Sequence, residues 1–564
     1  MRKDIFVLLI FLAVGLGLAY LLGLDQSAGW GRTRIALLSL GSFVLLCIAG
    51  YIFFTNRFLC IERKIRSFFE KYLSENRVAH YLKEYSFVFP YIATVFLLYV
   101  WFASAGTWTS WISPTRYYAN LAKGFQSGTL YTPTKPPSEL LILPDPYDYR
   151  ARDLAGIKPP IDISYYNGRY YLYWGPLPAL LLVLLSPLYS GRVGDLQLVF
   201  TFVCGIFLMQ SLVIIFMWDR FFCNQPKWML SSSMLLIGLS SPVTFMLANF
   251  SGARIYEAAI SGSQFFLVSG LLAALASVSD SFRAWKLMLA SILWMLAIGT
   301  RQTVLLSVMF MVFMLVYGII EDKNTSLQNI KKIFVLILPL VVGFFCMGWY
   351  NWARFGSVTE TGLYYQMNHG FVHYHTDELI SVRYVLQNLY NYLMMPFSIT
   401  HHFPFLTANI GRTKEILPFS TSRSSIYGSQ VITGVLSVVP FVIFAVIPLI
   451  MSIFKERSPR SGMQNLFNWI VVTLGGSSLA SFGFLMLFFW AAMRYAEDFM
   501  PSLIILSVIG FWQGYSLLSH KLLARKVYVA FGLLLASITI VVSTLLAISV
   551  NDARFVILQY FSSL

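Results

Sequence analysis

The chain has 564 residues, of which 57% are hydrophobic and only 12% are charged, and its mean hydropathy is +0.67. Soluble domains carry about 25% charged residues, so this composition excludes an ordinary soluble enzyme and indicates a polytopic membrane protein. The formal net charge of +16 does not indicate nucleic-acid binding, because most Lys and Arg residues flank apolar stretches, as they do beside membrane spans.

A membrane-spanning helix needs about 20 mostly apolar residues. This template predicts about 13 spans and an all-α polytopic membrane fold. The apolar run after Arg2 and Lys3 is interpreted as the first helix and not as a signal peptide, because no clear cleavage motif follows it. The predicted spans are 4–24, 34–54, 88–109, 196–217, 228–249, 257–278, 286–300, 302–320, 332–350, 428–451, 466–490, 500–518 and 527–549.

The placement of Lys and Arg in short loops predicts the orientation. The stretch after the second span, "NRFLCIERKIRSFFEKYLSENRVAHYLKEYS", contains seven Lys or Arg residues and is predicted to be cytoplasmic, as an amphipathic segment on the membrane surface. The apolar segment Pro176–Tyr189 is predicted not to cross, since a crossing would place the basic segment 321–332 outside. The N-terminus is then inside, the C-terminus is outside, and the protein is expected in the plasma (inner) membrane.

Four regions follow from this topology. They are two N-terminal spans with the amphipathic segment (1–87), a transmembrane core (88–350) containing a large first outer loop (110–195) with short juxtamembrane helices, a second outer loop (351–427), and C-terminal helices (428–564). No ionisable residue lies deep within a predicted span, whereas ion-coupled transporters place such residues near the membrane midplane. The sequence therefore favours work at the outer face over coupled pumping.

Seven stretches between Tyr117 and Leu503 resemble, in this order, the GT-C superfamily of membrane glycosyltransferases. The likeness is greatest to bacterial members related to the aminoarabinose and protein mannosyl transferases, with the first two spans as an addition. The stretches are "YYANLAKGFQSGTLY", "LPDPYDYRARD", "DISYYNGRYYLYWGPLPALL", "RIYEAAISGSQF", "AIGTRQT", "YNWARFGSVTETGLYYQM" and "RYAEDFMPSL".

The resemblance implies a polyprenyl-phosphate-linked sugar as donor and a glycan, lipid or protein as acceptor. It also implies inversion at the anomeric carbon, with an outer-loop carboxylate as the catalytic base. Members of the superfamily differ in metal dependence, so a divalent metal is left open as a cofactor.

Acids of the first outer loop are the candidate bases. Many GT-C members place an Asp directly after the helix that leads into this loop, whereas this chain reads "TWTSWISPTRYY" there, so the base is expected further on. Asp145 and Asp148 lie in "PDPYD", where each Pro restricts the residue before it. The alternative is that both only shape a turn. Asp162 is the rival candidate.

Three arginines at the outer ends of predicted spans, Arg301, Arg354 and Arg494, are candidates for binding the donor phosphate. The forked guanidinium matches phosphate oxygens, and an outer positive charge opposes the usual charge distribution. The alternatives are lipid head-group contacts for Arg301 and Arg354, and for Arg494 a salt bridge to Asp498 one helical turn on. The substrate-binding candidates are Tyr166, Tyr170, Tyr256, Glu257, Tyr495 and Asp498.

Two further residue classes give no metal site. His369 and His373 have a zinc-compatible helical spacing, but Gly370 disfavours a helix there, so structural or substrate contacts are favoured for these residues and for His375, His401 and His402. The five cysteines lack paired spacing and are interpreted as packing residues.

Two function classes stay open. The first is a glycosyltransferase that uses a lipid-linked sugar outside the cytoplasm. A nucleotide-sugar donor at the cytoplasmic face is not supported, since no phosphate-binding loop, nucleophile elbow or dinucleotide fingerprint appears. The second is a non-catalytic translocator or carrier of lipid-linked substrates, which has no need of a carboxylate fixed beside phosphate-binding arginines.

Overall fold

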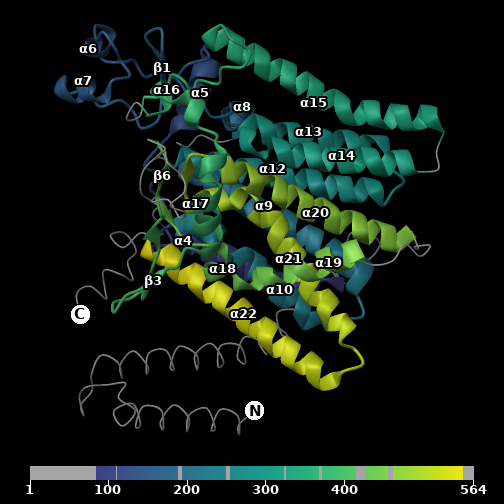
Figure 1. Cartoon of the computed structure of the whole chain (residues 1–564). Coiled ribbons are helices and arrows are strands. Elements are labelled where there is room, and N and C mark those ends of the chain that lie inside the picture. The colour runs from purple at the N-terminus through teal and green to yellow at the C-terminus, as the bar shows by residue number, and fades with distance from the viewer. Residues whose placement is uncertain are drawn as a thin grey trace, which may run out of the picture. The chain divides into compact units, whose positions relative to one another are not determined.

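The computed structural model describes residues 84–109, 111–188, 193–248, 254–322, 325–367, 371–413, 426–454 and 462–550 (Figure 1). The chain divides into two compact units, 1–93 and 94–564, and of the first only residues 84–93 are described. The spans predicted at 4–24 and 34–54, and the basic segment after them, lie outside the described residues.

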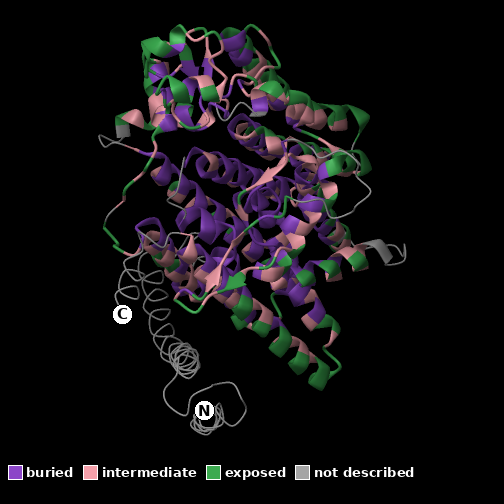
Figure 2. Ribbon diagram, turned by 60° about the vertical axis from the view of Figure 1, so that its left-hand side comes forward, coloured by how far each residue is buried: buried purple, intermediate pink, exposed green. Residues whose placement is uncertain are grey.

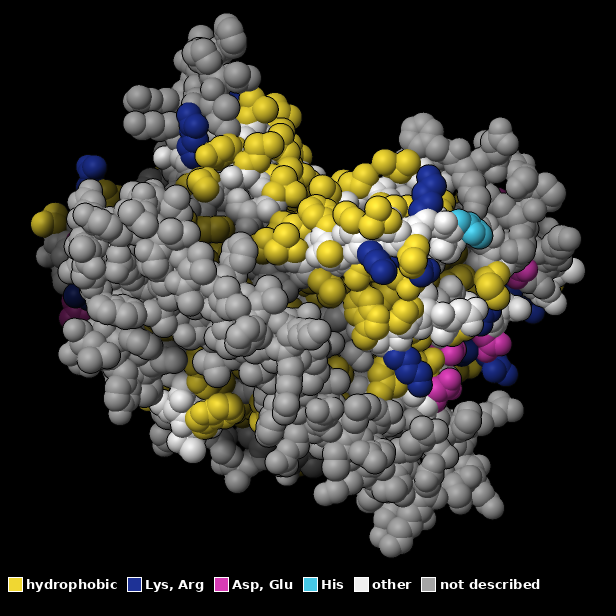
Figure 3. Space-filling view, turned by 90° about the horizontal axis from the view of Figure 1, so that it is seen from below, with side chains coloured by type: hydrophobic (Ala, Val, Ile, Leu, Met, Phe, Trp, Pro, Cys, Tyr) yellow, Lys and Arg dark blue, Asp and Glu magenta, His cyan; other side chains and the backbone are white. Residues whose placement is uncertain are grey.

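The described residues include eight helices long and apolar enough to cross a membrane, and three shorter apolar helices. The chain is a helical membrane protein, while the count of 13 spans stays a prediction. Among the described side chains on the face drawn in Figure 3, hydrophobic ones form extensive patches, with Lys and Arg side chains between them. The long helices are α4 (Phe89–Ala103), α9 (Asp195–Met217), α12 (Ile255–Val278), α14 (Leu305–Glu321), α15 (Ser326–Phe355), α20 (Gly462–Leu487), α21 (Met500–Leu517) and α22 (Leu522–Ser549).

Helix α12 is the most buried of the eight long helices, and α15 the least; Figure 2 shows where buried residues concentrate. Small residues explain the position of α12, because they let neighbouring helices approach closely. Gly262 lies against Phe202 of α9, and Gly270 lies against Trp294 of α13 (Ala284–Thr300). A bundle centred on α12 therefore follows from its glycine and serine content.

Two predicted spans differ from the structure. The span at 228–249 is interrupted between α10 (Lys227–Leu239) and α11 (Val243–Ala248), because Pro242 lacks the N–H that a continuous helix needs. The predicted start of a span at 428 is wrong. That position begins the short strands β6 (Gly428–Ser429) and β7 (Val431–Ile432), and the apolar helix runs over Pro440–Ser452.

The segment predicted as the first outer loop, called the first loop here, contains a hairpin and several short helices. Strands β1 (Ser164–Tyr166) and β2 (Arg169–Tyr171) pair in antiparallel register. The turn is Asn167-Gly168, both with positive φ (46° and 70°), as a tight two-residue hairpin turn requires. The helices are α5 (Tyr117–Gln126), α6 (Ser138–Leu141), α7 (Tyr149–Leu154) and α8 (Leu177–Leu185).

Helix α8 covers most of the apolar segment that was predicted not to cross the membrane. It has nine residues, a length of about 14 Å at the usual helical rise. A hydrocarbon core is about 30 Å thick, so α8 is too short to cross it. The residues before α8 and those after it are still free to lie on the same side, as the topology prediction requires.

The second loop, residues 356–434, contains short helices and strands that were not predicted. Its strands pair as β3 with β4 and as β5 with β7, both antiparallel, while β6 pairs in parallel with β8 (Trp490–Ala491). Its α-helices and other strands are α16 (Phe371–Tyr374), α17 (Val385–Leu389), β3 (Ser398–Ile399), β4 (Leu406–Thr407) and β5 (Asn409–Ile410), and α18 (Val435–Val438) follows the loop.

The two loops are joined by backbone hydrogen bonds. Tyr165 N–H donates to the carbonyl oxygen of Tyr365 (2.9 Å), and Met367 N–H donates to that of Ile163 (2.8 Å). The second loop thus adds an extended segment to the outer edge of β1. Figure 1 shows α5, α16 and β1 close together at one end of the long helices.

A buried carboxylate fixes the first loop to the membrane helices. Asp195, the first residue of α9, accepts hydrogen bonds from Thr115 Oγ1 (2.6 Å) and from the backbone N–H groups of Tyr117 (3.0 Å) and Tyr118 (3.3 Å). These N–H groups belong to the first turn of α5, which lacks intrahelical acceptors. Arg254 N–H also donates to Thr115 Oγ1 (3.1 Å), so the start of α12 joins the same anchor.

Candidate functional site

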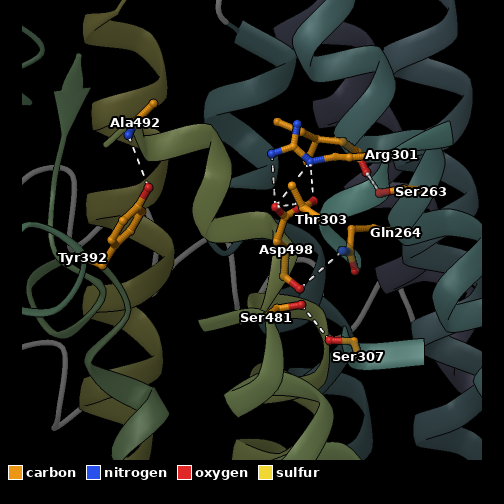
Figure 4. Close-up of polar contacts among 10 residues, drawn as sticks. Ser263, Gln264, Arg301, Thr303, Ser307, Tyr392, Ser481, Ala492 and Asp498 are labelled. Atoms are coloured by element: carbon orange, nitrogen blue, oxygen red, sulfur yellow. Dashed lines mark hydrogen bonds and ion pairs between the residues drawn. The ribbon is translucent and has the colours of Figure 1, made fainter. Parts of the chain in front are cut away.

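An ion pair between two distant segments forms the base of the candidate site (Figure 4). Arg301 follows α13 in an extended conformation and directs its guanidinium at Asp498, with Nη2 3.1 Å and Nε 3.3 Å from Oδ2. Thr303 Oγ1 donates to the same oxygen (3.0 Å). Asp498 is fully buried and Arg301 nearly so, so the pair is held rigidly.

This pairing corrects one alternative for Arg494. The sequence allowed an internal salt bridge between Arg494 and Asp498, but Asp498 pairs with Arg301 instead. Both Arg494 and Asp498 belong to η9 (Met493–Asp498), a 3-10 helix. With about three residues per turn, positions i and i+4 point about 120° apart, so the expected one-turn contact does not form.

Arg494 lies beside Arg301, and one aromatic ring connects them. The Arg494 guanidinium lies over the rings of Tyr256 (4.4 Å to the centroid) and Tyr495 (5.2 Å), and the Arg301 guanidinium lies over Tyr495 as well (5.0 Å). Arg494 Nη1 donates to Gln430 Oε1. Arg494 is mostly buried, and its Nε has no hydrogen-bond partner among the described residues. Both guanidiniums therefore contact the same ring, Tyr495.

Tyr256 connects this pair of arginines to an acid of the first loop. Its hydroxyl donates a hydrogen bond to the Asp162 carboxylate, while its ring lies beneath Arg494. Asp162 has a positive φ of 53°, a conformation that Asp adopts more readily than most residues. Among the three candidate bases, Asp162 is therefore the one that the structure brings to the arginines.

Tyr173, which the sequence analysis did not single out, lies among the same charges. Burial raises the pKa of the Tyr173 phenol well above its usual value, and the nearby Asp162 and Tyr495 raise it further, while Arg301 and Arg494 lower it. A phenol surrounded in this way stays protonated and serves as a hydrogen-bond donor.

The position of Tyr173 depends on a close backbone approach. A Cβ on Gly175 would lie 2.0 Å from the carbonyl oxygen of Gly299 and 2.8 Å from that of Thr300. Only a glycine can pack there, because both obstructing atoms belong to the backbone. This contact holds the segment with Tyr173 against the end of α13, directly before Arg301.

Asp145 and Asp148 have a different setting. Asp145 accepts hydrogen bonds from Tyr147 N–H (2.8 Å) and from the Tyr374 hydroxyl. Asp148 caps α7 by accepting from Arg150 N–H (2.9 Å). Burial raises the pKa of Asp145, but the hydrogen bonds from Tyr374 and Tyr147 outweigh it, so this pKa lies below its usual value. These contacts agree with the turn-shaping alternative.

Arg354 also stands apart from the other two arginines. Its Nη1 donates to the carbonyl oxygen of Leu172 (2.7 Å) and its Nη2 to Asn351 Oδ1 (2.8 Å), while its guanidinium lies 3.8 Å from the centroid of the Tyr350 ring. These contacts tie the end of α15 to the segment after β2. Arg354 thus has a sufficient structural role, and its predicted phosphate contact stays a prediction.

The other predicted substrate contacts divide between the site and the loops. Tyr495 and Asp498 belong to the site, and Glu257 is buried in the first turn of α12, next to Tyr256. Tyr166 lies against Tyr365, with ring centroids 4.5 Å apart. Tyr170 is buried inside the first loop.

The histidines gather no metal site in the part of the chain that the structure describes. His369 lies outside the described residues, and His375 Nδ1 lies 3.3 Å from Glu378 Oε1. His401 and His402 are exposed in the turn between β3 and β4. Among the described residues no three His, Cys, Asp or Glu side chains come together to hold an ion.

One solved structure is similar to this chain. It is the apo oligosaccharyltransferase of Archaeoglobus fulgidus, which is 13% identical, with a TM-score of 0.44. The match covers 83% of this chain and 56% of the other, so this chain spans little more than half the length of that protein. No family model and no curated protein matches. A likeness of this size assigns neither the residues nor the substrate of this chain.

Sequence reasoning missed several members of the site for different reasons. Tyr173 lies in the tyrosine-rich "YLYWG" stretch, where nothing marked one ring above its neighbours. Thr303 could have been predicted, since it follows Arg301 by two residues in "GTRQT". Gln430 had no signal, because it lies in a segment that was predicted to be the start of a span.

Proposed function

We propose that this protein is a membrane glycosyltransferase of the GT-C type, with Asp162 as the catalytic base. It transfers a sugar, with inversion, from a polyprenyl-phosphate donor to an acceptor at the extracytoplasmic face. The observation that carries this proposal is the placement of Tyr256, whose hydroxyl bonds to Asp162 and whose ring lies beneath Arg494. The reaction is taken from the sequence resemblance, and this geometry supports the roles proposed for the residues.

The reaction needs a proton acceptor on one side of the sugar. Asp162 takes the proton of the acceptor hydroxyl as its oxygen attacks the anomeric carbon. The bond between that carbon and the phosphate oxygen breaks on the opposite face, and its electron pair leaves with the phosphate. The products are an inverted glycoside, a protonated Asp162 and a polyprenyl phosphate whose negative charge has increased.

The arginines suit this leaving group. The described hydrogen bonds of Arg494 go to neutral side chains, Gln430 and Tyr495. The carboxylate of Glu257 is a nearby counter-charge, and a phosphate would add paired acceptors for the forked guanidinium. Arg301 is oriented by Asp498 and can share the same phosphate. Preorganised positive charge of this kind stabilises the charge that develops in the transition state.

The test compares two carboxamide variants of the purified protein in lipid nanodiscs. With a polyprenyl-phosphate-linked sugar and an acceptor, we expect Asp162→Asn to slow the release of polyprenyl phosphate by about a hundredfold or more. Asn tolerates the positive φ as well as Asp does, so the fold should persist. Asp148→Asn is the control, since Asn caps a helix as well as Asp. Wild-type rates in Asp162→Asn would exclude it as the base.

A translocator would behave differently in the same preparation. It would move a polyprenyl-phosphate lipid across a vesicle bilayer without releasing polyprenyl phosphate, and Asp162→Asn would leave that movement unchanged. Such a result would replace the transferase proposal.

A further inference from the structure

Four aromatic rings form a surface where the first and second loops meet. Tyr147 and His373 stack with centroids 3.9 Å apart and planes 11° apart. Tyr364 and Tyr374 contact the His373 ring at centroid distances of 4.3 Å and 5.1 Å. We call Tyr147, Tyr364, His373 and Tyr374 the aromatic surface. It is built from both loops, so it exists only when they are joined.

The aromatic surface is not the core of the loops. Tyr364 is 39% exposed and Tyr374 is 51% exposed, and neither Tyr147 nor His373 is fully buried. By contrast, Tyr170 of the neighbouring hairpin is 1% exposed. A group of rings left this accessible, beside a well-packed interior, is typical of a binding surface.

A carboxylate lies at the edge of the aromatic surface. Asp145 Oδ1 accepts from Tyr147 N–H (2.8 Å), and Oδ2 accepts from the Tyr374 hydroxyl. Each oxygen of an ionised carboxylate can accept more than one hydrogen bond, and Asp145 is partly exposed. It can therefore accept hydroxyl groups from a ligand seated on the rings.

The charges around Asp145 limit the class of ligand. The buried guanidinium of Arg152 is attracted to Asp153, Asp148 and Asp145, so it balances only part of their negative charge. These carboxylates disfavour an anion. A wholly apolar ligand would remove Asp145 from water without replacing its hydrogen bonds. A neutral ligand with hydroxyl groups and an apolar face uses both the exposed rings and the remaining acceptor capacity of Asp145.

We propose that the aromatic surface, together with Asp145, is a site for a neutral saccharide. The C–H groups on one face of a pyranose ring are weakly positive and lie well against the electron-rich faces of Tyr364 and Tyr374. The hydroxyl groups at the rim of the sugar donate to Asp145. The contacts of this site differ from those of the candidate active site, and the proposal does not depend on the transfer reaction.

The experiment uses the full-length protein in lipid nanodiscs. The probes are arrayed short neutral oligosaccharides of glucose, galactose, mannose and N-acetylglucosamine. We expect at least one probe to bind wild type. Tyr364→Ala and Tyr374→Ala should each weaken that binding about tenfold or more, whereas Tyr364→Phe should retain it, since the ring stays. Tyr317→Ala is the matched control, because Tyr317 is a comparably exposed tyrosine of α14 (49%) outside both loops.

A second set of variants separates this proposal from the proposed function. Asp145→Asn keeps the rings but loses the charged acceptor, and should weaken saccharide binding about tenfold. Asp162→Asn should leave saccharide binding unchanged even where transfer is lost. Thermal unfolding of each variant shows whether it is folded, and the more exposed Tyr374 carries the test if Tyr364→Ala is not. Failure of every neutral probe to bind, or equal binding by the alanine variants, would overturn the site.

Discussion

Replacing Gly175 with alanine tests whether the segment after β2 sits where the proposed site needs it. The added Cβ would lie 2.0 Å from the carbonyl oxygen of Gly299 and 2.6 Å from its carbonyl carbon. Ordinary contacts of this kind are 3.4–4 Å long, so the two segments must separate by more than about 1 Å. No side-chain rotation can relieve the contact, since both atoms are backbone.

The magnitude follows from two known scales. Overpacking a close contact costs about 1–3 kcal/mol, so the midpoint of thermal unfolding should fall. A displacement of about 1 Å in a positioned group can cost about a hundredfold in rate, and this segment carries Tyr173 toward Arg301. Transfer should therefore decrease by about that factor, while donor consumption by the remaining folded protein stays measurable.

Gly299 offers a control in the same contact. A Cβ there would meet only Leu177 Cβ, at 4.0 Å, and alanine is a better helix former than glycine. Gly299→Ala should keep wild-type activity with equal or higher thermal stability. The two variants are compared by polyprenyl phosphate release and by thermal unfolding in the same nanodiscs. If Gly175→Ala matched wild type in both measurements, the close approach and the placement of Tyr173 would be refuted.

Three further changes probe the charged groups. Arg301→Ala should destabilise the fold by about 3–5 kcal/mol, because it leaves Asp498 buried without its partner. The double variant Arg301→Ala/Asp498→Ala should unfold at a higher temperature than Arg301→Ala. If the losses of stability from the two single variants simply added in the double variant, the pairing would be contradicted. Arg354→Lys should lower thermal stability through its lost carbonyl contacts and change donor binding less than Arg494→Ala does, as measured by titration with a polyprenyl phosphate. The lowered pKa of Asp145 means that this group protonates only below the usual value of about 3.9. Its contribution to saccharide affinity should therefore be lost only as the pH drops through the folded pKa; equal affinities of wild type and Asp145→Asn at pH 7 would contradict it.

Local features of the fold could be predicted from the sequence because their causes are local. The turn at Asn167-Gly168 was marked by a dipeptide that suits two consecutive positive φ values. The short helix α8 was marked by the length of its apolar run. Pro242 was also present in the sequence as a sign of a helix break. The span was still predicted as continuous, because hydropathy averaged over a window does not account for the loss of a single backbone N–H. The strands of the second loop had no such marker, since each has only two residues.

The candidate site could be predicted only in part, because its members meet across long sequence separations. Predicted membrane depth placed Arg301, Arg354 and Arg494 at one level, but depth alone does not say which helices are neighbours. Packing around α12 decides that question and places Arg494 over Tyr256. The choice of Asp162 over the other two acids likewise needed the contact with Tyr256, which lies 94 residues away.

The pairing of the two loops has a consequence for biogenesis. The residues that it joins are far apart in the chain, as Ser164 and Gly362 are, at 198 residues. Chains are synthesised at about 5–20 residues per second, so β1 exists for about 10–40 s before its outer neighbour is made. During that interval its edge presents unpaired N–H and C=O groups to any other strand. The β1–β2 hairpin forms locally, so β2 can pair with one edge of β1 at once. The other edge of β1 stays unpaired until the second loop is made, and chaperone binding or mispairing would act on the nascent chain during that interval.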